Sequence, residues 1–432
     1  MRMILTMLLA GIASTAIAQD TQESEPAPEL VGGSVRSNVA IAVPVMPGDA
    51  VGRQVSEVIV SDLRSTGLFT PLGPGGLPGY SVEEAGNPAY PSWRNAGVSA
   101  LVSGYIEPRA DGRMTVACYL HDVTAGRELT HQGFAVTSAN WRQAAHKCAD
   151  LVYARLSGQQ PYLDTRIVYV AETGPKNNRQ KRIALMDSDG SNNRYLTVGR
   201  HTVVTPRFSP RGDRLVYVSY IGRKPRVLLY DVASGQERLL IPGNHITFAP
   251  RFSPDGRDVV FSMAEGGNTD IYIVSASGGQ PRRLTSAPGA DTSPSFSPDG
   301  RQIVFESDRS GTQQLYVMSA DGGGQRRISF GGGRYASPVW SPAGNMIAFT
   351  KIAGPFRIGV MNAGGGGERI LTNGWQDEGP SWAPNGQFVM FHRTAQGAGA
   401  TRLYAVPVGG GSARIMPTPV GGSDPSWSPI NN

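Results

Sequence analysis

With 432 residues, the chain is too long for one ordinary hydrophobic core, so two or more folded units are expected. An apolar content of 40% with 17% charged residues is typical of a globular protein and excludes a disordered or membrane-embedded chain. The net charge of +6 comes from scattered Lys and Arg, without a helix-turn-helix, zinc-finger or ribonucleoprotein pattern, so nucleic-acid binding is disfavoured.

The first 18 residues have the pattern of an export signal. Arg2 supplies a positive charge, residues 3–17 are largely apolar, and Ala16-Ile17-Ala18 is a small-x-small cleavage site. The alternative is a retained membrane anchor, but the apolar run is too short to span a bilayer and polar residues follow at once. We therefore expect a mature protein that begins near Gln19, lies outside the cytoplasm and has no transmembrane segment.

Residues 19–38 are polar and rich in Glu and Pro, which predicts a flexible segment. An α/β domain is predicted for residues 39–160, with two helices on a mixed sheet. Its predicted strands are 39–45, 98–106, 114–121 and 128–136, with a loop at 71–91. Apolar spacing predicts a helix over 50–65, followed by Gly67, and a second helix that Ser138 caps and Gly158 ends.

The two cysteines, Cys118 and Cys148, both fall in this domain. In an oxidising compartment they can form a disulfide that joins a strand to a helix. The alternative is a pair of buried thiols that act as small apolar residues. Export favours the disulfide.

Residues 161–432 repeat a short pattern: proline, any residue, an aromatic residue, serine or alanine, then proline. The six copies begin at Pro206, Pro250, Pro294, Pro338, Pro380 and Pro425, so they are 42 to 45 residues apart. A period of this length with strand-like content is typical of a β-propeller with one four-stranded blade per repeat.

The arrangement of the repeats also predicts how the ring closes. The copy at Pro425 has almost no chain after it, whereas residues 166–170 resemble a second strand that lacks an inner strand before it. The carboxy-terminal strand should therefore complete a blade whose other strands come from about 166–198. This predicts six blades with no unpaired inner edge.

Motifs for catalysis are missing from the sequence. There is no Gly-x-Ser-x-Gly elbow, Walker loop or Rossmann fingerprint, and the six histidines lack the spacing of zinc ligands, so we expect no catalytic residue, metal or cofactor. We interpret the histidines as surface or rim residues. The repeated aromatic residues are interpreted as packing between blades, because every unit of a repeat protein needs that contact.

Residues that vary just ahead of each motif are the better candidates for recognition. They connect an outer strand to the next inner strand and should surround one mouth of the central channel, where polar and hydroxyl groups suit a polypeptide partner. The candidates are His201, Thr205, His245, Thr247, Asp291, Thr292, Ser293, Tyr335, Ser337, Asp377, Glu378 and Asp424.

Taken together, the chain resembles the TolB family of exported propeller proteins of the Tol–Pal system. The resemblance rests on the export signal, on Ile41-Ala42-Val43-Pro44, on the helix end at residues 62–69, and on six repeats closed by a terminal Pro-Ser-Trp-Ser-Pro. It implies a non-enzymatic periplasmic adaptor that supports outer-membrane integrity and constriction during cell division.

The resemblance also implies two partners. The propeller mouth would bind the lipoprotein Pal, which would hold the protein peripherally at the outer membrane. The amino-terminal segment, around Glu29, Leu30 and Val31, would bind the carboxy-terminal domain of TolA. The alternative from another class is an exported propeller enzyme, or a module that binds a carbohydrate or small ligand in its channel.

Overall fold

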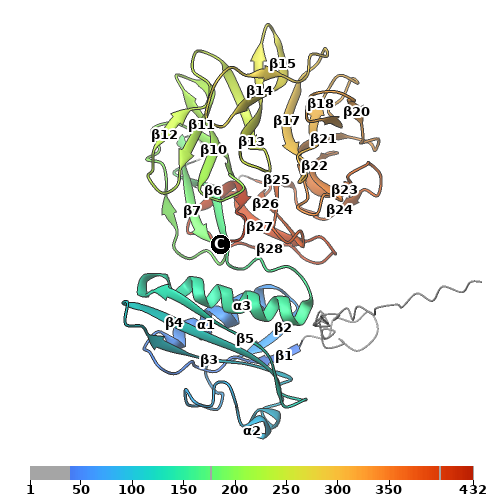
Figure 1. Cartoon of the computed structure of the whole chain (residues 1–432). Helices are drawn as coiled ribbons and strands as arrows, with labels where there is room; N and C mark the ends of the chain where they lie inside the picture. The colour runs from blue at the N-terminus through green and yellow to red at the C-terminus, as the bar shows by residue number, and fades with distance from the viewer. Residues whose placement is uncertain (1–38, 176–177, 398–399, 432) are drawn as a thin grey trace, which may run out of the picture.

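An α/β domain and an all-β domain lie side by side in the computed structural model, which describes residues 39–175, 178–397 and 400–431 (Figure 1). The export signal and the amino-terminal segment fall outside these residues. Among the described helices, none combines the length and the apolar character needed to cross a membrane.

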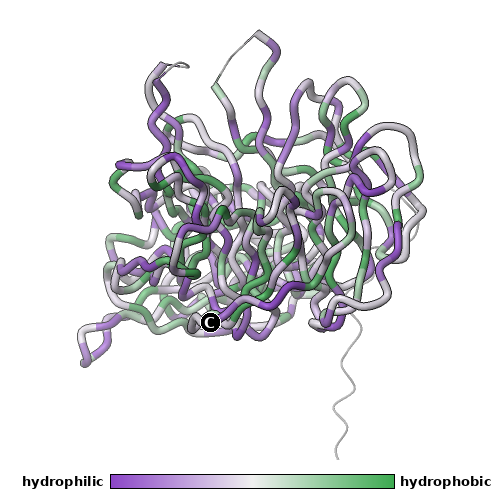
Figure 2. The backbone as a smooth tube through the Cα atoms, turned by 90° about the horizontal axis from the view of Figure 1, so that it is seen from above, coloured by the Kyte–Doolittle hydropathy of each residue, from purple (hydrophilic) through white to green (hydrophobic). Residues whose placement is uncertain are grey.

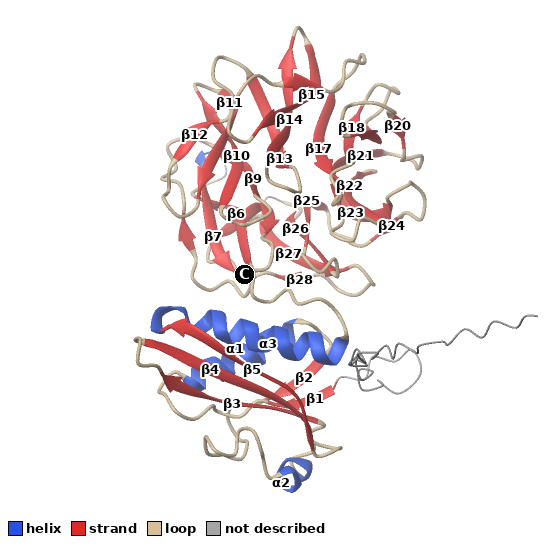
Figure 3. Ribbon diagram, viewed as in Figure 1, coloured by secondary structure: helices blue, strands red, loops and turns tan. Residues whose placement is uncertain are grey.

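The α/β domain is built on a five-stranded mixed sheet in the order β2-β1-β3-β4-β5. Its strands are β1 (Val39–Ala42), β2 (Phe69–Leu72), β3 (Ala100–Pro108), β4 (Arg113–Asp122) and β5 (Arg127–Thr137). Its helices are α1 (Gly52–Ser65), α2 (Tyr90–Asn95) and α3 (Trp141–Ser157), with a 3-10 turn, η1 (Ser138–Asn140). Helices α1 and α3 cover the sheet face turned toward the propeller (Figure 3).

Two local predictions in this domain are wrong. The predicted loop overlaps the end of β2 and the start of α2, because Pro71 is tolerated on an edge strand and Pro91 in the first turn of a helix. Ser138 does not cap α3, since η1 intervenes. The helix ends are as predicted: Gly67 and Gly158 have φ of 70° and 68°, which a side chain would strain.

Cys118 and Cys148 form a disulfide, which joins β4 to α3. Both residues are fully buried, in the same apolar cluster as Ile41 and Val152. The bond thus fixes the helix to the sheet through the centre of the domain core.

The second domain consists of six four-stranded blades, as predicted. Blade 1 combines β29 (Gly421–Trp427), β6 (Arg166–Thr173), β7 (Gln180–Asp187) and β8 (Arg194–Tyr195). Blade 2 is β9 (Val203–Phe208), β10 (Arg214–Ile221), β11 (Lys224–Asp231) and β12 (Glu237–Leu239). Blade 3 is β13 (Ile246–Phe252), β14 (Asp258–Glu265), β15 (Asn268–Ser275) and β16 (Arg282–Arg283).

The remaining blades repeat this order. Blade 4 is β17 (Asp291–Phe296), β18 (Gln302–Ser307), β19 (Gln314–Ser319) and β20 (Arg326–Arg327). Blade 5 is β21 (Arg334–Trp340), β22 (Met346–Ile352), β23 (Phe356–Asn362) and β24 (Arg369–Ile370). Blade 6 is β25 (Gln376–Trp382), β26 (Phe388–Thr394), β27 (Arg402–Pro407) and β28 (Arg414–Ile415). One parallel pairing, Phe356 with Gln376, joins blades 5 and 6 at their rims.

The ring closes as the repeat pattern predicts. The inner strand of blade 1, β29, comes from the carboxy-terminal end and pairs antiparallel with β6, with Trp427 opposite Ile167. The six inner strands contact one another around the channel. Hydrophilic segments gather in the outer loops, while apolar stretches run through the interior (Figure 2).

The α/β domain attaches at the end of blades 1 and 6 where the inner strands finish. The Trp427 indole donates a hydrogen bond to Thr165 in the linker, and the Arg166 N–H donates to the Ser428 hydroxyl, both at 2.8 Å. One apolar cluster continues from α1 and α3 through Tyr162 into Phe388 and Trp427. The predicted recognition residues lie at the opposite, beginning ends of the inner strands.

Candidate protein-binding face of the propeller

Each inner strand is kinked at the residue that precedes the motif proline. In all six copies this residue has a positive φ, from 49° at Asp424 to 66° at Gly379, and the strand register shifts there. Five of the six are not glycine: Thr205, Ala249, Ser293, Ser337 and Asp424. This conformation costs about 1–3 kcal/mol at such residues, so the surrounding blade must enforce it.

The kink decides which predicted residues reach the surface. Residues one and two positions before the proline are partly exposed, except for buried Ser423, whereas those three positions before it are buried. Consequently Thr247, Asp291, Tyr335 and Asp377 lie inside the blades. The prediction that these four line an open mouth is wrong, because a bulge turns their side chains away from the channel.

Two of these buried residues form ion pairs within their own blades. Asp291 pairs with Arg309 at 2.5 Å, and Asp377 pairs with Arg393 through contacts of 2.6 and 2.9 Å. Both guanidinium groups lie over aromatic rings of the same blade. Asp291 and Asp377 therefore stabilise the blades and are unavailable to a partner.

The other predicted residues do surround the mouth. His201 is exposed, and His245, Thr205, Thr292, Ser293, Ser337, Glu378 and Asp424 are partly exposed. The Glu378 side chain is 32% exposed. They form a polar rim, which we call the mouth, composed of these eight residues.

Hydrogen bonds between blades fix the mouth in place. Glu306 on β18 accepts hydrogen bonds from the Thr292 and Ser293 hydroxyls at 2.5 and 3.1 Å. It also accepts the Ser337 N–H of the next blade at 2.6 Å. Similarly, the Asp424 carboxylate accepts the Thr205 N–H at 3.3 Å, which links blades 1 and 2. The mouth is therefore a preorganised surface.

Two residues that contact the mouth were missed from the sequence: Glu306 and His392. His392 accepts the Asp424 N–H at 3.3 Å and lies 3.9 Å from the Glu378 carboxylate. Both follow the aromatic residue of a blade's second strand, directly across from the mouth. Variation at that repeat position, which also holds Ser262 and Thr350, was a signal that could have identified them.

A polar cavity of about 370 Å³ opens beside the mouth, between blades 6 and 1. Its lining includes the charged residues Glu172, Arg179, Lys181 and Asp424, together with His392. Burial would raise the pKa of the Glu172 carboxyl, but hydrogen bonds, first from Lys181, hold that pKa below its usual value. The cavity thus presents fixed charges of both signs to a docking partner.

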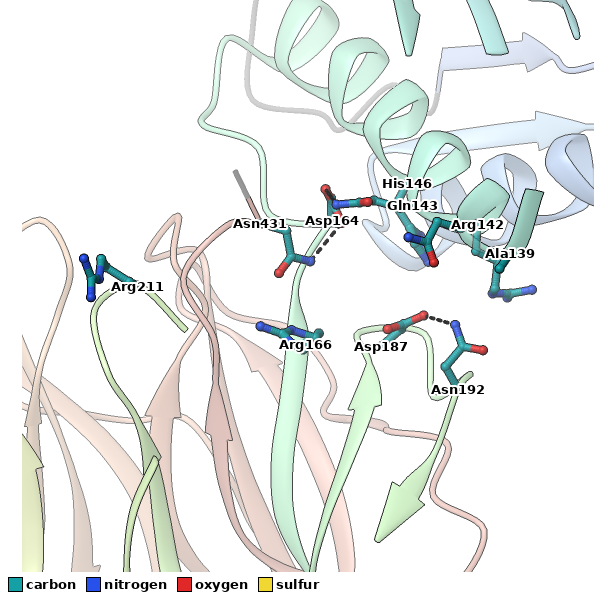
Figure 4. A pocket seen from close by; sticks show the side chains of 11 residues that line it. Ala139, Arg142, Gln143, His146, Asp164, Arg166, Asp187, Asn192, Arg211 and Asn431 are labelled. Atoms are coloured by element: carbon teal, nitrogen blue, oxygen red, sulfur yellow. Dashed lines mark hydrogen bonds between the residues drawn. The ribbon is translucent and has the colours of Figure 1, made fainter. Parts of the chain in front are cut away.

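Between the domains lies another polar cavity, of about 450 Å³, lined by Arg142 and His146 of α3 and by Arg166 and Asp187 of blade 1 (Figure 4). His146 is buried, so its interpretation as a surface residue is wrong. So is that of His121, which is fully buried against Ser103 and Ala85.

Asp62, His146 and Asp189 are the one set among the described residues whose carboxylate and imidazole atoms are close enough to hold a metal ion. The two ring nitrogens face different carboxylates: Nδ1 is 2.6 Å from Asp62, and Nε2 is 3.8 Å from Asp189. Arg142 already pairs with Asp189 at 2.5 Å. This geometry is that of an ion-pair network between the domains.

Comparisons with family models, curated proteins and solved structures all point to the same family. Residues 30–129 match the model for the TolB amino-terminal domain, and residues 153–431 match the model for the TolB beta propeller domain. A Tol-Pal system protein TolB from Zymomonas mobilis is 52% identical over 242 residues, which cover 51% of this chain and 53% of that protein. One from Rhizorhabdus wittichii is 54% identical over 235 residues, 52% of each chain.

The chain thus spans about half the length of the curated relatives it matches. Among solved structures, TolB from Acinetobacter baumannii superposes with a TM-score of 0.81 at 28% identity, covering 91% of this chain and 97% of that one. On the two family matches, which together cover most of the sequence, the chain belongs to the TolB family.

Proposed function

We propose that this protein is a non-enzymatic periplasmic adaptor of the Tol–Pal system, which binds the lipoprotein Pal at the mouth of its propeller. Its relatives of about 50% identity are named Tol-Pal system proteins. In this role it would associate peripherally with the outer membrane through Pal and support envelope integrity and constriction during division.

The observation that carries the proposal is the rigid polar mouth. Its strained backbone and its hydrogen bonds between blades hold hydroxyl and carboxylate groups in fixed positions at a partly exposed rim. A preorganised surface loses little conformational entropy when a folded partner docks. The disulfide between Cys118 and Cys148 supports an oxidising compartment such as the periplasm.

Charge reversal at the mouth tests the Pal assignment. In capture experiments from detergent-solubilised envelopes, Glu378→Arg should bind Pal about tenfold more weakly than the unchanged protein. The substitution replaces a negative charge at the mouth with a positive one and so removes the electrostatic complementarity to the partner. The matched control is Glu107→Arg, an exposed residue of the α/β domain. If both variants lose Pal binding equally, or if Glu378→Arg binds Pal as well as the unchanged protein, Pal does not bind at the mouth.

We further propose that the amino-terminal segment binds the carboxy-terminal domain of TolA. The residues implied by the family, Glu29, Leu30 and Val31, lie outside the described part of the chain. Deleting residues 19–37 should abolish capture by the purified TolA domain, while a propeller with an intact mouth still captures Pal. Retained TolA binding would refute this assignment.

A further inference from the structure

The propeller channel has a second polar opening, at the end opposite the mouth. The residue that follows the motif proline in each copy points into one cavity of about 250 Å³ at the end of the inner strands. These six residues are Arg207, Arg251, Ser295, Val339, Ser381 and Ser426. The repeated motif thus contributes to a lining as well as to blade packing, and this opening is distinct from the mouth.

Three of these side chains bind the free backbone edge of a neighbouring inner strand. The Ser295 and Ser381 hydroxyls accept the N–H groups of Trp340 and Trp427 at 3.4 and 3.0 Å. Arg207 donates to the carbonyls of Asp424 and Pro425 at 3.4 and 3.2 Å. These contacts are structural. The inner strands of adjacent blades do not pair with each other, so their facing backbone N–H and C=O groups need side chains as hydrogen-bond partners.

Arg251 departs from this role. Within the described part of the chain, its guanidinium makes no hydrogen bond or ion pair, and no carboxylate lines the cavity. The neighbouring charge is Arg207, which is of the same sign. The Arg251 side chain is partly exposed, and desolvation, followed by the charge of Arg207, lowers the pKa of Arg251. The cavity therefore has cationic donors in excess and lacks anionic acceptors.

We propose that this cavity binds a small oxyanion, a carboxylate or a phosphate, between Arg251 and Arg207. The planar guanidinium offers paired N–H donors that match the oxygens of either group. Lining hydroxyls such as Ser426 supply neutral donors beside them. The volume is below that of ordinary drug-sized pockets, so the ligand is a small anion and not an oligosaccharide.

Titration of the mature protein with inorganic phosphate and, separately, with acetate tests the site, at constant ionic strength and with binding followed by calorimetry. We expect saturable binding of at least one of the two, and comparison of the arms identifies the preferred oxyanion. Absence of saturable binding of both would overturn the proposal without any variant.

Variants then locate the site. Arg251→Gln keeps most of the side-chain size and removes the charge, so it should weaken anion binding at least tenfold. Arg257→Gln is the matched control, since this arginine of the same blade is 85% exposed and lies outside the cavity. Thermal unfolding without anion should show that Arg251→Gln is folded, because it removes an unpaired charge. Unchanged binding in folded Arg251→Gln would refute the assignment.

Discussion

Replacing His146 with glutamine should lower the free energy of unfolding by about 3–5 kcal/mol, the usual effect of removing one partner from a buried ion pair. His146 on α3 lies between Asp62 on α1 and Asp189 in the turn after β7. Without the imidazolium, the Asp62 carboxylate would remain buried without its cation. Since Asp189 belongs to blade 1, the variant should also weaken docking of the two domains.

The same residue should make stability depend on pH. Burial alone would lower the pKa of His146, but attraction to Asp62 and then to Asp189 raises it to about 9. A raised pKa adds stability that is complete below the unfolded value near 6.5 and is lost as the pH rises through about 9. At 1.36 kcal/mol per pKa unit, this loss is about 3 kcal/mol between pH 6.5 and 9.

Urea unfolding at pH 6, 7.5 and 9.5 measures this dependence. The unchanged protein and the exposed control His201→Gln should both lose stability across the series, and His146→Gln should lose about 3 kcal/mol less. If His146→Gln follows a curve parallel to that of the unchanged protein, His146 is not the group that titrates.

The propeller itself could be predicted from the sequence because every blade has the same local requirements. The motif proline, the aromatic residue and the turn that begins with Ser-Pro or Ala-Pro recur wherever an inner strand ends, so their period gives the number of blades. Closure by β29 was predictable for the same reason. The motif copy at Pro425 lacks the later strands of a blade, the strand at 166–170 lacks an inner strand before it, and the two pair in the structure.

The recognition residues could be predicted only in part, because burial near a bulge depends on three-dimensional register. Asp291 and Glu378 look equivalent in the sequence, yet they stand three and two positions before their prolines, which places one inside a blade and the other at the mouth. The His146 network joins three distant segments, and local patterns do not reveal such contacts. Arg251 stands out only in the structure. Arg207, at the same position of the preceding repeat, donates hydrogen bonds to backbone carbonyls, and Arg251 does not.

Trp427 joins the ring closure to the domain interface, so its loss should affect both domains. Its N–H groups bind Ser381 of blade 6 and Thr165 of the linker. Its ring packs edge-on against Tyr162, with centroids 6.0 Å apart. Trp427→Ala should lower the free energy of unfolding by about 3–5 kcal/mol, the usual cost of removing a large buried side chain.

Because one apolar cluster runs from α1 through Tyr162 to Trp427, the loss should appear in both domains together. Denaturant unfolding followed by far-ultraviolet circular dichroism reports mainly on the helices of the α/β domain. Tryptophan fluorescence reports on the blades once Trp93 and Trp141, the two tryptophans of the α/β domain, are replaced by phenylalanine in every variant. Both midpoints should fall in Trp427→Ala, whereas the exposed control Trp375→Ala should change stability by less than about 0.5 kcal/mol. A lower fluorescence midpoint with an unchanged helical transition would show that the domains unfold independently, and that β29 closes the propeller without stabilising the interface.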